Sequence, residues 1–137
     1  MDTEELWKDD RIIPVVTVND NSGEVLMVGY MNKDAYEHTM KTHRVWYYSR
    51  HRKKISMKGA HSGNTQRIMS ITADDKMESL LIRVQQKGQI CSKDGGHDTC
   101  YINKLYKRSE SKRRRKFGKV DIDENFDFSK EDYEEED

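Results

Sequence analysis

The chain has 137 residues, of which 34% are apolar and 36% are charged, and its formal net charge at pH 7 is zero. This length leaves room for one compact domain and little else. The apolar share is below that of an average globular domain, so we expect part of the chain not to fold. No stretch comes near the roughly 20 apolar residues that a membrane-spanning helix needs, which excludes that class of protein.

The charges are distributed unevenly along the chain. Residues 107–119 contain eight Lys or Arg and one Glu, whereas residues 120–137 contain ten Asp or Glu and one Lys. Up to Tyr106, sixteen basic residues face fourteen acidic ones. We therefore predict a near-neutral domain at residues 1–106 and a disordered tail at residues 107–137, with a basic block followed by an acidic block.

The tail raises the question of a nucleic-acid partner. Its basic block includes KRRRK at Lys112–Lys116, which could bind a phosphodiester backbone or act as a localisation signal. Short basic blocks of this kind are often unspecific, and the two halves of the tail attract each other. We favour a solubilising tail over a nucleic-acid partner.

The N-terminal residues MDTEELWKDD are acidic and do not resemble a signal peptide. We therefore expect a cytoplasmic protein. In a reducing compartment the two cysteines, Cys91 and Cys100, are thiols or metal ligands rather than a disulfide.

The first predicted elements are a β-hairpin and a helix. RIIPVVTVND and EVLMVGYM are β-branched and apolar, and the turn-forming NDNSG lies between them. Pro14 places the first strand at an edge or makes it start late. Asn32 is a candidate N-cap for a helix over KDAYEHTMKTH.

The remaining elements are mostly strands. RVWYYSR predicts a strand in which Trp46 and Tyr48 lie on one face and Tyr47 on the other. HRKKISMKGAHSGNTQ breaks the pattern, and RIMSITA and SLLIRVQQ then flank DDKME as a second hairpin. This order predicts an α+β fold that is mainly β, a largely antiparallel sheet covered by one α-helix.

The loop KGAHSGNTQ, Lys58–Gln66, is small, polar and basic at once. Gly59 and Gly63 let backbone amides approach an anion closely, and Ser62 and Asn64 add short donors. With the charges of Arg50 and Lys58, the loop suits a phosphate. Taken alone, such a loop is also typical of an ordinary surface turn.

Three segments resemble phosphoribosyl-AMP cyclohydrolase in order and spacing: GEVLMVGYMNKDA, VWYYSRHRKKISMKGAHSGNTQ, and ITADDKMESLLIRV to QICSKDGGHDTCY. The resemblance covers about Arg11–Tyr101. Its most specific part is Tyr48-Ser49-Arg50, Lys58-Gly59 and Ser62-Gly63-Asn64-x-Gln66. It implies an antiparallel pseudo-barrel capped by one helix, an intertwined homodimer, and a hydrolase that opens the purine ring of an N1-ribosylated adenine nucleotide in histidine biosynthesis, using water activated by zinc.

The resemblance also assigns residues to the substrate. The residues expected to bind the phosphorylated adenine nucleotide are Arg50, Lys58, Gly59, Ser62, Gly63, Asn64 and Gln66. The candidate catalytic residues are His61 and His97.

The metal turn of this chain departs from the family pattern. The family has Asp-Cys-Asp-x-Asp, with the cysteine binding zinc across the dimer and the aspartates binding magnesium, where this chain has Asp74-Asp75-Lys76-Met77-Glu78. We expect one zinc per subunit, held by Cys91, Cys100 and a third group, either Asp75 of the partner or His97. Asp74 and Glu78 remain candidate magnesium ligands. Lys76 replaces a carboxylate, so we expect magnesium binding to be weakened.

Other departures touch the substrate side. Ala60 and His61 stand where the family usually has Glu and Thr, and Ser56 stands where Trp is frequent. These changes leave two alternatives open. In the first alternative, the chain is a diverged paralogue that acts on another phosphorylated, N1-modified nucleotide. In the second, it is a non-catalytic paralogue that binds nucleotides or nucleic acid.

Overall fold

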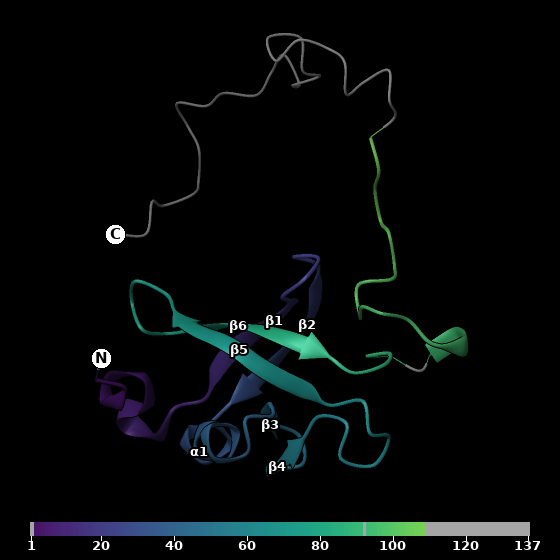
Figure 1. Cartoon of the computed structure of the whole chain (residues 1–137). Helices are drawn as coiled ribbons and strands as arrows, with labels where there is room; N and C mark the ends of the chain where they lie inside the picture. Colours follow the sequence, from purple (N-terminus) through teal and green to yellow (C-terminus); the bar gives the residue numbers. More distant parts are fainter. Residues whose placement is uncertain (1, 92, 109–137) are drawn as a thin grey trace, which may run out of the picture. The chain divides into compact units, whose positions relative to one another are not determined.

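The structure, a computed structural model, describes residues 2–91 and 93–108. The chain divides into two units, residues 1–103 and residues 104–137, and all the strands and the α-helix that the structure describes belong to the first (Figure 1). The elements are β1 (Ile13–Asn19), β2 (Val25–Met31), α1 (Lys33–Thr42), β3 (Trp46–Ser49), β4 (Lys54–Met57), β5 (Gln66–Ala73) and β6 (Leu80–Gln86), with 3₁₀ turns at Glu4–Asp10 and Lys93–Gly95. Apart from Lys107 and Arg108, the predicted tail, including Lys112–Lys116, lies outside the described residues.

The main sheet has four strands in the order β2-β1-β6-β5, and β3 and β4 form a separate two-stranded ribbon. The two predicted hairpins are confirmed, because β1 pairs antiparallel with β2 and β5 pairs antiparallel with β6. The largely antiparallel pairing that was predicted is found in β1–β2, β3–β4 and β5–β6, whereas β1 and β6 at the centre of the main sheet run parallel, so this sheet is mixed. The expected pseudo-barrel is not confirmed, since the described strands form an open sheet.

Pro14 lies inside β1, a central strand of the sheet. One of its two predicted placements, at a sheet edge, is therefore wrong. Pro14 is the second residue of β1 and pairs only with Tyr30 of β2. The pairing of β1 with β6 begins one residue later, at Val15. Pro14 has no amide hydrogen, but it lies before the first residue of β1 that pairs with β6. It therefore does not interrupt the hydrogen bonds between these two strands.

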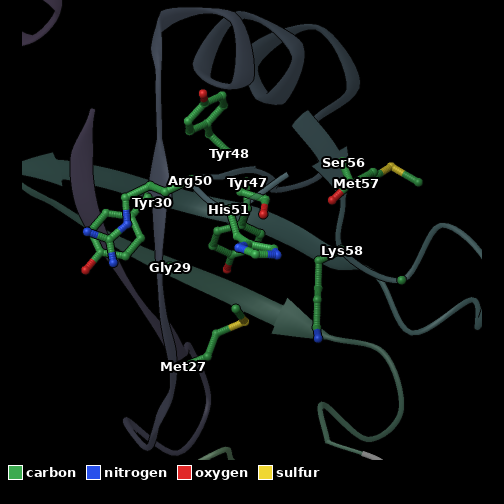
Figure 2. Close-up of a pocket in the computed structure, with 12 residues that line it drawn as sticks. Met27, Gly29, Tyr30, Tyr47, Tyr48, Arg50, His51, Ser56, Met57 and Lys58 are labelled. Carbon is green, nitrogen blue, oxygen red and sulfur yellow. The ribbon is translucent and has the colours of Figure 1, made fainter. Parts of the chain in front are cut away.

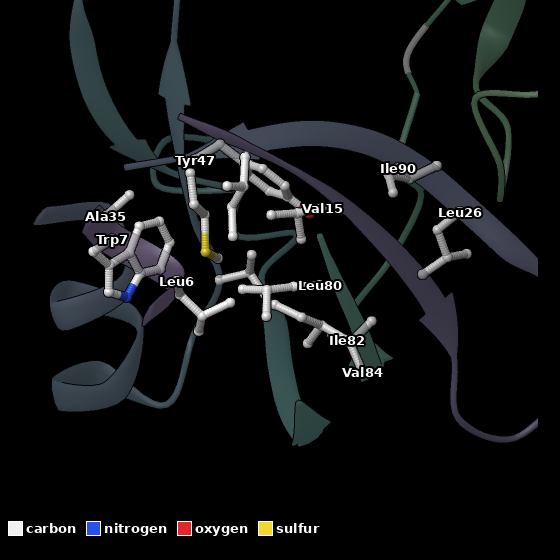
Figure 3. Packing of buried hydrophobic residues seen from close by; sticks show 13 residues of the cluster. Leu6, Trp7, Val15, Leu26, Ala35, Tyr47, Leu80, Ile82, Val84 and Ile90 are labelled. Carbon is white, nitrogen blue, oxygen red and sulfur yellow. The ribbon is translucent and has the colours of Figure 1, made fainter. Parts of the chain in front are cut away.

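One face of the sheet carries the hydrophobic core. Alternate residues of β1 and β6 are buried, and α1 and the β3–β4 ribbon lie on the same side of the sheet (Figures 1 and 3). Two residues of the first 3₁₀ segment, Leu6 and Trp7, join this core. Trp7 packs against Tyr36 of α1, with 5.3 Å between the ring centroids.

The predicted helix is confirmed, with the predicted N-cap. The side-chain oxygen of Asn32 accepts a hydrogen bond from the Ala35 amide at 2.9 Å, and the helix ends where His43 adopts a left-handed φ of 57°. The buried hydroxyl of Thr39 accepts a hydrogen bond from the Trp46 amide at 2.9 Å. The helix therefore positions the start of β3 as well as covering the sheet.

β4 is a strand that the sequence pattern does not predict. Residues 51–66 were expected to break the pattern, yet Lys54–Met57 pair antiparallel with β3. Only one strongly apolar β-former, Ile55, lies in the middle of this basic stretch, so its periodicity is weak. The predicted alternation of β3 is confirmed, because Tyr47 is buried while its two neighbours are half-buried. Within residues 2–91 and 93–108, no helix is long and apolar enough to cross a membrane.

Candidate functional site

A pocket of about 780 Å³ opens beside the β3–β4 ribbon. Its lining comes from β2, from β3 and the two residues after it, and from β4 and the two residues after it. Figure 2 shows Arg50 and Lys58 on opposite sides of this pocket, with His51 between them. The volume is within the range of small-molecule sites, roughly 300–1,000 Å³.

The turn between β3 and β4 presents Arg50 and His51 to the pocket. Ser49 closes this turn, because its carbonyl oxygen accepts from the Lys53 amide at 2.7 Å and its hydroxyl accepts from the Arg52 amide at 3.1 Å. Lys53 takes a left-handed φ of 55° to complete it. The local hydrogen bonds of Ser49 therefore place both basic side chains.

Tyr47 forms the floor of the pocket. Its ring lies so close to Gly29 of β2 that a Cβ atom on Gly29 would be 2.4 Å from Cδ1 of the ring. Its hydroxyl donates to Gln66 Oε1 at 2.6 Å and lies 3.3 Å from Thr17 Oγ1. Burial raises the pKa of the Tyr47 hydroxyl, so the group stays protonated as a donor.

The walls of the pocket are basic. The guanidinium carbon of Arg50 lies 3.8 Å from the centroid of the Tyr30 ring, a cation–π contact. Lys58 is half-buried, and its amide donates to the Val45 carbonyl at 3.0 Å. Among the described residues that line this pocket none is acidic. The pocket is therefore suited to an anion.

The loop Lys58–Gln66 is folded upon itself rather than wrapped around the pocket. Gly59 has a φ of 79°, and a Cβ atom there would be 2.3 Å from backbone atoms of Asn64. The Gly63 amide donates to the Gly59 carbonyl at 2.8 Å, and the Asn64 amide donates to the Ser62 hydroxyl at 3.1 Å. The Gly63 amide, one of the donors expected to hold phosphate, is thus used inside the loop.

The predicted phosphate-binding residues fall into three groups. Arg50, Lys58 and Gly59 line the pocket. Gln66 is fully buried beneath it, bonded to Tyr47, and so cannot touch a ligand in the pocket directly. The other loop residues are outside the pocket lining: Ser62, Gly63, Asn64 and the catalytic candidate His61.

The segment with the two cysteines lies near Lys58, because both Lys58 and Cys91 act on the Cys100 thiol. Cys91 and His97 form an isolated antiparallel bridge, with the His97 amide 2.6 Å from the Cys91 carbonyl oxygen. The Cys100 amide donates to the Leu26 carbonyl of β2 at 2.8 Å. Partial burial raises the pKa of the Cys100 thiol, the Lys58 ammonium opposes this rise, and Cys91 adds to it. The pocket and the two cysteines are therefore neighbours.

His97 carries an unsatisfied polar atom. Its Nε2 is buried and has no hydrogen-bond partner among the described residues. A buried nitrogen without a partner is rare in folded proteins and is a reason to look for a ligand or a proton-transfer role.

The acidic turn lies at the other end of β6 from the cysteines. Asp74 Oδ1 accepts from the Glu78 amide at 2.7 Å, and Asp74 Oδ2 accepts from the Ser79 hydroxyl at 3.0 Å. These bonds, that of the Glu78 amide first, lower the pKa of Asp74. The seven residues of β6 span roughly 20 Å and separate this turn from Cys91. No group of three His, Cys, Asp or Glu placed to hold a metal exists within the described part of one chain.

Three pocket residues on β2 were missed by sequence reasoning: Met27, Gly29 and Tyr30. One signal could have found them. A glycine inside a strand often marks a place where another group approaches the backbone closely, and Gly29 is such a residue.

Comparison with known proteins identifies relatives for this arrangement. Residues 27–102 match the family described as phosphoribosyl-AMP cyclohydrolase. Three proteins with that same name are similar to this chain. The protein of Bacillus cytotoxicus is 39% identical over 94 residues, which are 69% of this chain and 91% of the relative. That of Bacillus cereus strain G9842 is 41% identical over 90 residues, 66% and 87% of the two chains. That of Nitrosomonas eutropha is 40% identical over 99 residues, 72% and 76% of the two chains.

Proposed function

Because the chain belongs to the phosphoribosyl-AMP cyclohydrolase family, we propose that it hydrolyses phosphoribosyl-AMP, opening the purine ring of this N1-ribosylated adenine nucleotide. The observation that carries the proposal is a basic, tyrosine-floored pocket whose Lys58 acts on the Cys100 thiol, on which Cys91 acts as well.

The pocket residues take separate roles in this proposal. Arg50 and Lys58 bind phosphate, since one offers a planar fork of donors and the other a compact charge. Arg50 can do so while it stays on the face of Tyr30, because the N–H groups of a guanidinium lie in its own plane. The small exposed part of Tyr47 closes the bottom of the pocket beneath the nucleotide. Opposite walls of positive charge suit a substrate with a phosphate at each end.

The residues near Lys58 fit zinc. Two thiolates suit zinc rather than oxygen-binding cations such as magnesium, and zinc also accepts a carboxylate oxygen as a ligand. We propose that Cys91 and Cys100 hold it and that Asp75 of a second copy completes the set, since one chain does not bring Asp75 to the cysteines. Zinc bound there would lower the pKa of water to about 7. The Lys58 ammonium favours the thiolate form of Cys100, and His97 Nε2 accepts a proton from the attacking water.

Magnesium has weaker support. The carboxylate of Asp74 is already bonded to the turn that contains it, and the charge of Lys76 acts on the same carboxylate. We propose weak or absent magnesium dependence. We assign no catalytic role to His61, because it lies outside the pocket lining.

We also propose that the chain acts as a homodimer. Val28, Val16, Leu81 and Thr72 are paired in register across all four strands, so their side chains form one row on the sheet face away from α1. Val28 and Leu81 are each 43% exposed. An exposed aliphatic row of this kind is the type of surface that a second subunit covers.

The test follows ring opening by ultraviolet absorbance and measures metal content on the same sample. We expect one zinc per subunit and slow but measurable hydrolysis of phosphoribosyl-AMP, with both lost in Cys91→Ser. Asp98→Asn is the matched control, because Asp98 is an exposed acid of the same segment outside the proposed ligand set. If the purified protein contains no zinc and does not hydrolyse phosphoribosyl-AMP, the proposal that it is an enzyme is rejected.

A second substrate is the alternative that one observation favours. Ser56 lines the pocket at a position where the family frequently has Trp, which changes the shape of the wall. Zinc-loaded protein that is inert on phosphoribosyl-AMP but opens another N1-modified adenine nucleotide would select this alternative.

A further inference from the structure

A buried hydrogen-bond network lies directly under the pocket. Gln66 and Thr17 are both 0% exposed, and both contact the hydroxyl of Tyr47, the only member of the three that lines the pocket. The shorter contact, 2.6 Å, is to Gln66 Oε1. The ring of Tyr47 is therefore held at its far end by a residue that no ligand can reach.

The backbone of Gln66 is part of the same arrangement. Its carbonyl oxygen accepts from the Val45 amide at 3.0 Å, and the Val45 carbonyl accepts from the Lys58 amide at 3.0 Å. Gln66 begins β5, Val45 precedes β3, and Lys58 follows β4. One residue is thus connected both to the pocket floor and, through Val45, to the backbone of the pocket lysine.

Gly29 restricts the ring from its face. A Cβ atom on Gly29 would lie 2.4 Å from Cδ1 and 2.8 Å from Cε1 of Tyr47. The ring therefore rests on bare backbone of β2, and its hydroxyl end is tied to β5 and β1 by Gln66 and Thr17. Two independent constraints, one steric and one by hydrogen bonding, set the same ring.

We infer that Gln66 is a positioning residue of the pocket, which acts through Tyr47 by holding its ring across Gly29 as the floor beneath the nucleotide. The inference rests on the proposed function for the identity of the ligand. It replaces the expectation that Gln66 binds phosphate, because a fully buried side chain that contacts the underside of Tyr47 can influence the ligand only through that residue.

The amide of Gln66 has little else to hold it. Its Nε2 is buried and has no hydrogen-bond partner within residues 2–91 and 93–108. Removing the Tyr47 hydroxyl would leave the whole buried amide unsatisfied, whereas replacing both partners with apolar groups avoids that cost. A comparison of single and double substitutions therefore distinguishes the hydrogen bond between Tyr47 and Gln66 from a general effect on packing.

The experiment is a double-mutant cycle of Tyr47→Phe and Gln66→Met, with 5′-AMP binding as the probe. We expect each single variant to raise the Kd by about 3- to 10-fold, the range that one net hydrogen bond supplies, and the double variant to be no weaker than either single one. With phosphoribosyl-AMP, KM should rise by a similar factor while kcat changes less, because the floor touches the nucleotide and not the reacting water. Gly29→Ala should raise the Kd by the steric route.

Ile82→Val is the control for stability alone, because Ile82 is fully buried in β6 and does not line the pocket. It should lower the melting temperature without changing the Kd. If Gln66→Met does not fold, Thr17→Val tests the same network, with a smaller shift in the same direction. Gln66→Met that melts earlier but binds 5′-AMP like the wild type, or strictly additive losses in the cycle, would overturn the inference.

Nuclear magnetic resonance separates this inference from the proposed function. The slowly exchanging hydroxyl proton of Tyr47, assigned by its loss in Tyr47→Phe, should disappear or shift in Gln66→Met, with changed ring signals. This readout needs neither turnover nor nucleotide. If the wild type neither binds 5′-AMP nor acts on phosphoribosyl-AMP, the proposed function fails while the ring signals still decide the position of Tyr47. Unchanged ring signals in Gln66→Met would overturn the positioning role.

Discussion

At the scale of single residues, Lys58 joins the two halves of the site. Its amide is bonded to Val45, which holds the start of the loop in place, and its side chain lines the pocket. The same ammonium opposes the rise in the pKa of Cys100. A half-buried lysine with its backbone held in this way suits a fixed charge aimed at a phosphate.

Lys58→Ala should weaken 5′-AMP binding by about 10-fold, because a charged hydrogen bond to phosphate is lost. Stability should change by less than about 1 kcal/mol, since a charge that is not deeply buried adds little to folding. Calorimetric titration and thermal melting measure the two quantities. Lys54→Ala is the control, because Lys54 lies on β4 but outside the pocket lining. If the wild type and Lys58→Ala bind 5′-AMP with equal affinity, the loop is an ordinary surface turn without a role in phosphate binding.

At the scale of elements, the β5–β6 turn is shaped by one carboxylate. Asp74 accepts hydrogen bonds from the Glu78 amide and from both the amide and the hydroxyl of Ser79. Arg11 holds the same turn from the N-terminal side by donating to the Met77 carbonyl. The hydrogen bonds of Asp74 therefore stabilise the turn itself, and they do so without a metal ion.

The pKa of Asp74 gives this turn a pH dependence. Its folded value lies below the ordinary 3.8, so its contribution to stability is present above pH 3.8 and is lost as the pH falls through the lower, folded-state value. Asp74→Ala should therefore have a lower melting temperature than the wild type at pH 6. The difference between the two melting temperatures should become smaller at pH 2–3. Melting curves over pH 2–7 measure this. Glu78→Ala is the control, because the exposed Glu78 side chain accepts none of the described hydrogen bonds of the turn. A constant gap for Asp74→Ala would contradict the assignment.

At the scale of the whole molecule, the sheet has one covered face and one open face. The covered face packs against α1 and β3, while the row of Val28, Val16 and Leu81 stays at least partly exposed. The zinc proposal needs Asp75 from a second copy because β6 separates it from Cys91. The exposed row and the divided ligand set both point to the same kind of assembly.

Leu81→Lys should convert the proposed dimer into a monomer at micromolar concentration, because it places a charge in the exposed aliphatic row. Analytical ultracentrifugation measures the mass, and zinc content should fall together with the dimer. Met40→Lys is the control, since Met40 is equally exposed but lies on α1, on the other side of the sheet. A wild-type chain that sediments as a folded monomer would contradict the dimer and with it the shared zinc site.

Local patterns in the sequence determined the elements of this protein. The turn formers between β1 and β2, the cap at Asn32 and the alternation around Tyr47 act over a few residues, so the hairpins, the helix and the buried face of β3 could be predicted. The motif Tyr48-Ser49-Arg50 and Lys58-Gly59 likewise located two sides of the pocket. β4 could not be predicted, because its pairing with β3 and not its own composition makes it a strand.

Only the tertiary structure decided which distant residues meet. The parallel pairing of Val15 with Leu80, the contact of Tyr47 with Gln66, and the approach of Cys100 to Lys58 each join parts of the chain far apart in sequence. No local preference encodes such pairs, because they follow from packing one common core. For the same reason Gln66, which lies in a conspicuous polar motif, is a buried support of the pocket rather than one of its walls.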